Sequence, residues 1–257
     1  MKILNIIICF LTVAVSFAQE KLKISYQEFV NNEYPIQREE ILLVDVANKK
    51  SIYAMDYTNQ KMFDSKDGQH KLSEIGMQVD RIVDNNYIVF DLKNKKMEMF
   101  EDFGRRFYKI NDAFPDLKWE LVSNETKKIN DIECKKAITH FRGSTWEVWY
   151  APSIPLPFGP WKLHGLPGLI LEAKDKEEKF YFIARSIEHN SSYVIDIPKS
   201  TIQKEISLKQ YLLIQDDLYN NIPISSPGMI DLSEKFNFVK NTKEKEFEFP
   251  VEFSWEE

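Results

Sequence analysis

Cysteine and histidine are the side chains of this sequence that could bind a metal ion. Cys134, His140 and His164 all lie in the central part of the chain. Cys134 and His140 are six residues apart, so on one regular strand they would share a face but lie roughly 20 Å apart. The sequence contains no C-x-x-C, no H-E-x-x-H and no closely spaced histidine pair. We therefore predict no metal site and no cofactor.

Local motifs for hydrolytic chemistry are also absent from the sequence. No G-x-S-x-G segment occurs, so no serine stands in a recognisable nucleophile turn. His164 could act as a base, but a histidine that is hydrogen-bonded to a loop carbonyl is the commoner arrangement. The acidic pairs Asp216-Asp217 and Glu177-Glu178 have polar neighbours, which is typical of solvated faces and turns. We therefore predict no catalytic residue and a protein that is not an enzyme.

The segment from Trp146 to Glu172 has the most unusual composition, with five prolines and three glycines. Proline fixes φ and glycine permits left-handed turns, so a long loop can hold one shape without regular secondary structure. In one interpretation the loop is the wall of a pocket in which Trp149, Phe158, Trp161 and Leu166 bind an apolar ligand. In the other it is a hydrophobic cap that closes the core. We favour the cap.

The same segment carries a resemblance to a known family. Its hexapeptide Gly165-Leu166-Pro167-Gly168-Leu169-Ile170 resembles the motif that names the GLPGLI family, a group of uncharacterised exported proteins of diderm bacteria. Two further blocks resemble that family, namely 124–137 and the run 149–160 that leads into the hexapeptide. The resemblance implies export but no activity. From the residues alone we expect the hexapeptide to be a structural motif that turns the chain and directs leucines inward.

The first 18 residues have the order of a secretory signal peptide. Met1-Lys2 is positively charged, 3–15 is almost wholly apolar, and Ser16-Phe17-Ala18 offers small residues at a cleavage site. The apolar run is well short of the roughly 20 residues that span a membrane, and too little hydrophobic segment precedes Cys9 for it to be a lipidated residue. We predict a signal peptide over residues 1–18 and one β-rich domain over 19–257, exported to the periplasm, the cell surface or the medium.

Charge and cysteine content narrow the set of partners. The formal net charge is −6 for the full chain and −7 once the lysine of the signal peptide is removed. Nucleic-acid binding usually needs a basic face, so we predict no nucleic-acid partner. The mature chain keeps one cysteine, Cys134, which cannot form an intramolecular disulfide. We expect it to be buried and unreactive.

Apolar and polar residues alternate along most of the chain, which is typical of strands with one buried and one wetted face. Asn48-Lys49-Lys50 and Lys93-Asn94-Lys95 are natural turns between such segments. The segments that we expect to form strands are 22–29, 40–46, 51–57, 87–92, 96–100, 107–110, 118–122, 136–141, 145–150, 169–173 and 180–187. This pattern predicts a mainly β (α+β) fold with a curved, mostly antiparallel sheet or half-barrel, a Pro/Gly-rich loop and one or two helices.

One stretch has helical spacing instead. After Ser207, the apolar residues up to Tyr219 recur every three or four positions, and Asn220-Asn221 with Pro223 would end the helix. Ser207 is the expected N-cap. The tail 240–257 alternates charged and aromatic residues, which suggests a final edge strand or a loosely held end.

Three functions are compatible with these expectations. The first is an envelope binding or carrier protein with an apolar ligand or lipid in a half-barrel groove, an analogy at the level of the fold. The second is an interaction or accessory module of an outer-membrane transport or secretion complex, with an envelope protein as its partner. The third, which we rank last, is an uncharacterised enzyme. A polar cleft in which perturbed acidic and basic groups converge would favour the third.

Overall fold

The structure is a computed structural model, and it describes residues 21–31, 36–55, 61–64, 71–72, 86–103 and 106–221. The predicted signal peptide and the tail 240–257 lie outside these residues. Within them, twelve strands form one continuous open sheet in the order β14-β8-β7-β6-β3-β2-β1-β13-β12-β11-β10-β9. Every pairing along this order is antiparallel except that of β14 with β8. The predicted mainly β, mostly antiparallel fold is therefore confirmed.

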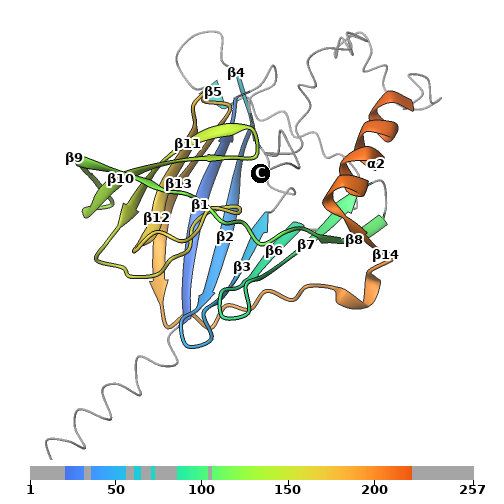
Figure 1. Cartoon of the computed structure of the whole chain (residues 1–257), viewed down its shortest axis with the longest axis horizontal. Helices are drawn as coiled ribbons and strands as arrows, with labels where there is room; N and C mark the ends of the chain where they lie inside the picture. The colour runs from blue at the N-terminus through green and yellow to red at the C-terminus, as the bar shows by residue number, and fades with distance from the viewer. Residues whose placement is uncertain are drawn as a thin grey trace, which may run out of the picture.

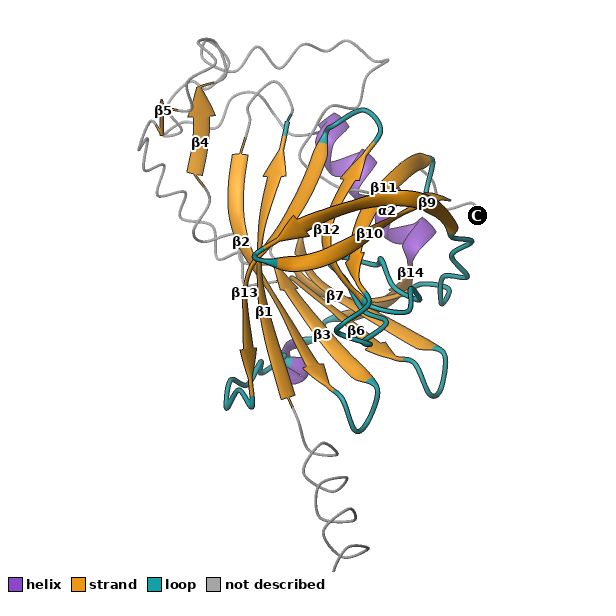
Figure 2. Cartoon of the chain, turned by 90° about the vertical axis from the view of Figure 1, so that its left-hand side faces the viewer, coloured by secondary structure: helices purple, strands orange, loops and turns teal. Residues whose placement is uncertain are grey.

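The sheet extends across the molecule from β9, beside β10 at one edge, to β14, beneath α2 at the other edge (Figure 1). Figure 2 shows β9 and β10 crossing in front of β1 and β13, so that the sheet curls round one of its faces. Their bounds are β1 Lys21–Val30, β2 Ile36–Asp45, β3 Lys50–Met55, β4 Lys61–Asp64, β5 Lys71–Leu72, β6 Asn86–Asp91, β7 Lys96–Phe103, β8 Arg106–Asn111, β9 Glu120–Ile129, β10 Ile132–Phe141, β11 Ser144–Ala151, β12 Leu169–Asp175, β13 Phe180–His189 and β14 Lys204–Ser207. β4 and β5 pair with each other, and β4 also pairs with β2.

Two hairpins use the same turn chemistry. The β2–β3 turn begins at Asp45, whose carboxylate accepts hydrogen bonds from the backbone N–H and the side-chain amide of Asn48, at 3.0 and 2.8 Å. The β6–β7 turn repeats this between Asp91 and Asn94, at 3.1 and 2.8 Å. Both turns were predicted from the sequence, and the side-chain bonds show why Asp and Asn recur at this spacing.

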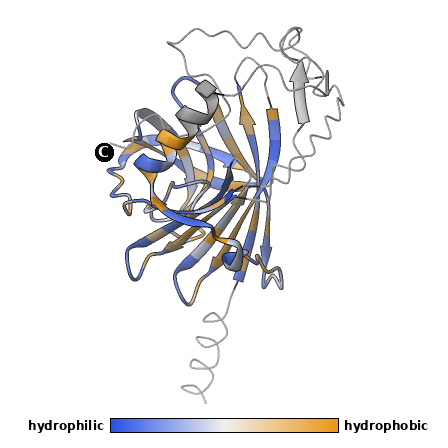
Figure 3. Cartoon of the chain, turned by 90° about the vertical axis from the view of Figure 1, so that its right-hand side faces the viewer, coloured by the Kyte–Doolittle hydropathy of each residue, from blue (hydrophilic) through white to orange (hydrophobic). Residues whose placement is uncertain are grey.

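One face of the sheet carries the hydrophobic core. We call it the inner face, and it is the face on which the loop 152–168 packs. A single row of paired residues crosses seven strands on this face, and all its members are buried: Ile24, Leu42, Tyr53, Ile88, Met99, Ile110 and Ile206. The alternation of hydrophobic and hydrophilic residues along the strands is visible in Figure 3. The alternation of buried and exposed residues fixes the register of the strands, because shifting a strand by one residue would turn its buried side chains to the solvent.

The opposite, outer face is partly covered by the segment 190–203. This segment leaves β13 and returns to β14 along one end of the sheet (Figure 1). Ile195, Ile197 and Ile202 pack against a small second cluster of buried side chains on β3, β6, β7 and β8. The segment includes the short 3-10 helix η1, Lys199–Thr201. It ends in β14, so it ties the outer layer to the sheet by backbone hydrogen bonds.

The predicted helix is α2, Leu208–Asn221. It begins at the expected N-cap, where the Ser207 hydroxyl accepts from the backbone N–H of Gln210 at 3.3 Å and the Gln210 side chain accepts from the backbone N–H of Ser207 at 3.0 Å. This reciprocal pair is a capping box. Within the described residues, no helix is both long and apolar enough to cross a membrane.

Candidate functional site

Three of the four residues predicted to bind a ligand lie in the core of the inner face. Phe158, Trp161 and Leu166 are all buried. The Trp161 ring centre lies 5.4 Å from that of Trp146 on β11 and 5.4 Å from that of Phe141 on β10. The loop therefore seats its aromatic side chains on the sheet, as the cap interpretation expects. Ligand binding by these residues stays a prediction.

The fourth residue, Trp149, lies on the other face. It is three positions after Trp146 on β11, and alternation along a strand puts the two indoles on opposite sides of the sheet. Two ammonium groups lie near its ring centre, Lys127 Nζ at 4.6 Å and Lys136 Nζ at 5.8 Å. The structure thus does not bring Trp149 together with Trp161.

The hexapeptide 165–170 makes a close turn against the end of β11. Gly165 has a φ of +93°, a conformation that a side chain would strain. Gly168 has a different constraint, because a Cβ there would lie 2.3 Å from the carbonyl oxygen of Ala151. Leu166, Leu169 and the residue that follows it are buried. These contacts fit an architectural role for the motif.

The side chains considered for metal binding have separate surroundings. Cys134 is buried, and burial raises the pKa of its thiol to about 11. The His140 ring nitrogen lies 3.2 Å from the Thr145 hydroxyl. The His164 Nδ1 lies 2.9 Å from the carbonyl oxygen of Lys162, so this histidine bonds a loop carbonyl. Among the described residues, no three Cys, His, Asp or Glu side chains gather closely enough to hold a metal ion.

A cluster of buried charges occupies the inner face beside the apolar row. Glu28 on β1 is paired with Arg38 on β2, whose guanidinium donates a hydrogen bond to the Glu28 carboxylate. Arg38 Nε also lies 3.4 Å from a carboxyl oxygen of Glu40, and the Tyr53 hydroxyl donates to the other oxygen of Glu40. Glu28 and Glu40 are each about 1% exposed, and Arg38 is 4% exposed. We call these four residues the carboxyl cluster.

Burial sets the protonation of the carboxyl cluster. Loss of water raises the pKa of Glu40 well above its usual value, and the negative charge of Glu28 raises it further, while the charge of Arg38 lowers it. Burial and the neighbouring Glu40 raise the pKa of Tyr53 as well, so its hydroxyl remains a donor.

A second set of buried charges connects the inner face to the loop. Lys162, fully buried in the loop, lies with its Nζ 2.8 Å from one oxygen of Asp112, and Arg142 lies 2.6 Å from the other oxygen. On β7, Glu101 accepts a hydrogen bond from the Tyr211 hydroxyl of α2. Burial raises the pKa of Glu101, whereas the charges of Lys162 and Arg38 lower it. The charges of Lys162 in this set and of Arg38 in the carboxyl cluster thus both act on the Glu101 carboxyl group.

The carboxyl cluster can supply both an acid and a base. A carboxyl group with a raised pKa, such as that of Glu40, can donate a proton, and a second carboxyl group beside it can accept one. Because the two carboxyl groups are about 1% exposed, they are closed to a substrate in the described state. In the described state the cluster holds β1, β2 and β3 together through charged hydrogen bonds.

An open, curled antiparallel sheet with ionisable groups converging on one face defines a β-sheet domain with a polar inner site. Comparison with known proteins identifies its family. The chain belongs to the family described as "N-glycanase peptide, N-terminal domain", whose profile matches residues 24–212. A comparison with curated proteins found no match.

One solved structure supports the fold, and two others are similar at lower scores. The structure of PNGF-II in space group P21 is similar with a TM-score of 0.52 and 19% sequence identity, and the match covers 76% of this chain and 33% of that chain. A second PNGF-II crystal form, in space group C2, has a TM-score of 0.47 at 20% identity, with 78% and 33% covered. A putative outer membrane lipoprotein-sorting protein domain from Vibrio parahaemolyticus has a TM-score of 0.25, at 8% identity. This chain therefore spans about one third of the length of PNGF-II.

The family match corrects three predictions made from the sequence. The assignment to the GLPGLI family is wrong, because the family shown is the N-terminal domain of N-glycanase. The prediction of a non-enzymatic protein is wrong as well, since this is a domain family of an enzyme. The functions built on that prediction, a carrier of an apolar ligand or an accessory module of a transport or secretion complex, are withdrawn with it.

The physical reason for these errors lies in the position of the charged residues. A short motif that turns the chain against Ala151 reports on architecture and carries no chemistry. The carboxyl cluster comes from three strands, and its acids and bases share no local motif. The alternation along β1 could have revealed the cluster, because Glu28 falls on the same side of the strand as the buried residues Ile24 and Tyr26.

Proposed function

We propose that this chain acts on N-glycosylated peptides as the N-terminal domain of an N-glycanase. The observation that carries the proposal is the family match over residues 24–212, which runs from β1 into α2. The fold that the chain shares with PNGF-II over 76% of its length supports it. The chain spans one third of that protein. The experiment must therefore measure which step, binding or hydrolysis, the chain performs by itself.

The carboxyl cluster is compatible with this proposal. An amidase adds water across a carbon–nitrogen bond, so it needs a base that activates water and an acid that protonates the leaving nitrogen. Glu40, whose pKa is raised, offers a protonated carboxyl group beside that of Glu28, and Arg38 offers charge to a developing oxyanion. The arrangement thus contains the types of group that hydrolysis of a glycosylated asparagine requires.

The test is to expose a peptide with one N-linked chitobiose to the purified chain. We expect the glycopeptide to be retained on the immobilised chain while the same peptide without sugar elutes. Mass spectrometry of the recovered peptide then shows whether asparagine has become aspartate. The fraction of asparagine converted is expected to decrease in the Glu40→Gln variant. It is expected to stay unchanged in Glu188→Gln, a control at an exposed ion pair with Lys23. Equal retention of the two peptides, without conversion, would contradict the proposal.

We also propose that the chain is exported and that the mature protein is one domain beginning at Gln19. The order of positive, apolar and small residues over 1–18 supports this. N-terminal sequencing of protein recovered from the cell envelope is expected to start at Gln19, without a lipid on Cys9. A start at Met1 would contradict it. The absence of a nucleic-acid partner and the presence of an envelope-protein partner stay predictions.

A further inference from the structure

Two hairpin turns at one end of the sheet share a sequence pattern. Residues 45–50 read Asp-Val-Ala-Asn-Lys-Lys, and residues 91–96 read Asp-Leu-Lys-Asn-Lys-Lys. We call these two segments the paired turns, and Figure 2 shows their loops, in teal, at the lower end of the sheet. They lie side by side because β3 pairs with β6. The backbone N–H of Leu92 donates to the carbonyl oxygen of Lys49 at 3.1 Å, and the Lys93 ammonium donates to that of Ala47 at 3.1 Å.

A lysine occupies the strained position of each paired turn. Lys49 has a φ of 53° and Lys95 a φ of 48°, in the left-handed region that glycine and asparagine adopt at less cost. Both side chains are exposed. Residues held in strained conformations cluster at functional sites. The same strain at equivalent positions of two turns therefore indicates that the two charges have a use.

The acidic groups near the paired turns have other partners. Asp91 pairs with the neighbouring Lys50, at 3.0 Å. Asp116 has a lowered pKa because Lys118 pairs with it, and the charge of Lys95 adds a smaller effect. Among the described residues, neither of the two strained lysines forms an ion pair of its own. Their charges are therefore available to an anionic partner.

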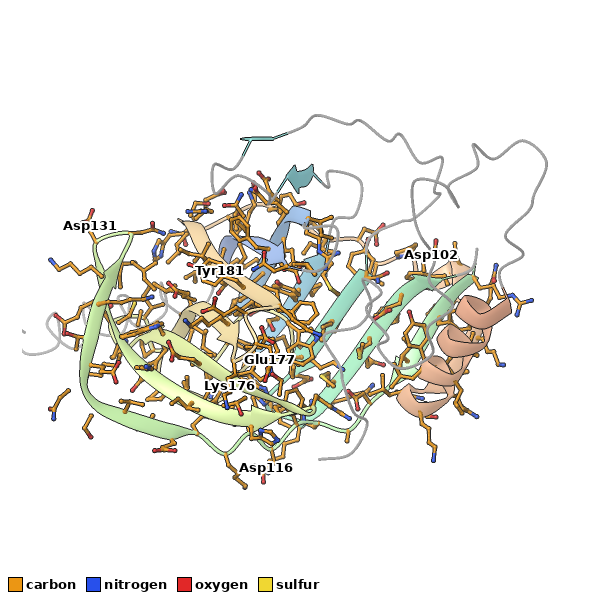
Figure 4. All side chains as sticks on the ribbon, turned by 90° about the horizontal axis from the view of Figure 1, so that it is seen from above. Asp102, Asp116, Asp131, Lys176, Glu177 and Tyr181 are labelled. Carbon is orange, nitrogen blue, oxygen red and sulfur yellow. The ribbon has the colours of Figure 1, made fainter. Side chains whose placement is uncertain are left out.

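The paired turns form a basic end on an acidic protein. Their five lysines and two aspartates give a formal net charge of +3, whereas that of the whole chain is −6. The opposite end of the sheet faces the viewer in Figure 4 and carries acidic side chains, among them Asp102 at the end of β7 and Glu177 in the β12–β13 turn. An anionic surface therefore attracts the paired turns and repels the opposite end.

Apolar side chains are exposed beside the paired turns. The segment that follows β13 begins there, because the backbone N–H of Ser191 donates to the carbonyl oxygen of Lys21 at 3.1 Å, and Lys21 is paired with Asp45. Two consecutive residues of this segment, Tyr193 and Val194, are 41% and 72% exposed. Tyrosine is enriched at membrane–water interfaces, and apolar side chains on a basic surface enter the boundary between headgroups and acyl chains. This end thus combines positive charge with apolar groups.

We infer that the paired turns, together with Tyr193 and Val194, dock on an anionic phospholipid surface. Lysines close to such a surface are attracted by the lipid phosphates, and the apolar side chains add their burial to that attraction. Docking at this end leaves the carboxyl cluster away from the membrane, because Glu28 lies seven residues along β1 from Lys21, on the order of 20 Å. The inference goes beyond the proposed function and does not depend on it.

The experiment measures sedimentation of the chain from Gln19 onward with lipid vesicles, because the apolar run 3–15 would itself enter a bilayer. We expect at least about tenfold tighter binding to phosphatidylglycerol vesicles than to phosphatidylcholine vesicles, with a loss of binding as salt is added.

Two double variants remove the same amount of charge from different places. Lys49→Asn with Lys95→Asn keeps residues that tolerate a positive φ, so we expect an unchanged melting temperature and at least about tenfold weaker binding to phosphatidylglycerol. The matched control is Lys128→Gln with Lys135→Gln, because both lysines are exposed on the β9–β10 hairpin, away from the paired turns. Its binding is expected to equal that of the wild type.

Several results would overturn the inference. One is equal binding of the wild type to the two kinds of vesicle, and another is a turn variant that binds phosphatidylglycerol as well as the wild type or the control variant does. Inorganic phosphate at constant ionic strength is expected to leave the bound fraction unchanged, so displacement by it would assign the turns to free phosphate instead of a membrane. Should the turn variant fail to fold, Lys93→Glu at an exposed position decides, with the same loss of binding expected.

Discussion

The buried Lys162 gives a prediction that can be worked out in full. Its ammonium is 0% exposed, and burial lowers its pKa from 10.5 to about 8, against the opposing effect of Asp112. The unfolded chain therefore holds this proton up to about pH 10.5, whereas the folded chain releases it from about pH 8. Over that window the unfolded state binds more protons, so stability rises with pH.

The expected size follows from the width of the window. A pKa lowered from 10.5 to about 8 corresponds to about 3 kcal/mol of stability that is absent below pH 8 and present above pH 10.5. Lys162→Met removes the titrating group but keeps the length of the side chain. The difference in unfolding free energy, wild type minus Lys162→Met, should therefore increase by about 3 kcal/mol from pH 8 to pH 10.5.

Urea unfolding followed by tryptophan fluorescence at several pH values measures this difference. Taking the difference between the two proteins cancels the titration of the tyrosines. Lys109→Met is the control, because pairing with Glu205 and Glu98 raises the pKa of Lys109, so its contribution is lost only above pH 10.5. A wild-type minus Lys162→Met difference that stays flat from pH 8 to pH 10.5 would refute the reasoning.

Three further perturbations test other parts of the structure. Gly168→Ala should destabilise the protein by about 1–3 kcal/mol in urea unfolding, because the new Cβ meets the backbone of Ala151, and an unchanged midpoint would contradict that close approach. Cys134, whose pKa is raised to about 11 by burial, should react with a thiol reagent only as fast as the protein unfolds, so rapid labelling of the native protein would disprove its burial. Burial raises the pKa of Glu101, so its contribution to stability is present below about pH 4.5 and is lost as the pH rises through the raised value. The stability of the wild type relative to Glu101→Gln should thus fall from pH 4.5 to pH 8, and a rise would be the wrong sign.

Local chemistry made much of the fold predictable. The two Asp-x-x-Asn turns and the Ser207 cap each depend on residues within four positions, so their signals stand in the sequence. The β9–β10 hairpin was missed, although Asn130 and Asp131 carry its two-residue turn with φ values of 48° and 62°. Positive φ at both positions is typical of a type I′ turn, and Asn and Asp tolerate it. Strand β9 therefore continues to Ile129, beyond the predicted 118–122.

Long-range contacts account for what the sequence could not predict. β14 pairs in parallel with β8, whose residues precede it by about a hundred positions in the chain. The alternation of apolar and polar residues does not indicate such a distant partner. The charges of the inner face were hidden for a related reason, because acids and bases in strands usually face water. Lys162 shows this most clearly, since its neighbours in the sequence are those of a loop and its partner Asp112 lies 50 residues away.

The claim that this domain acts on N-glycosylated peptides is tested most directly by one pair of titrations. The full chain is titrated with the chitobiose peptide and, separately, with the identical peptide that lacks the sugar. We predict measurable binding of the glycopeptide and at least about tenfold weaker binding of the bare peptide, a difference of about 1.4 kcal/mol. Equal affinity for the two peptides would contradict the account.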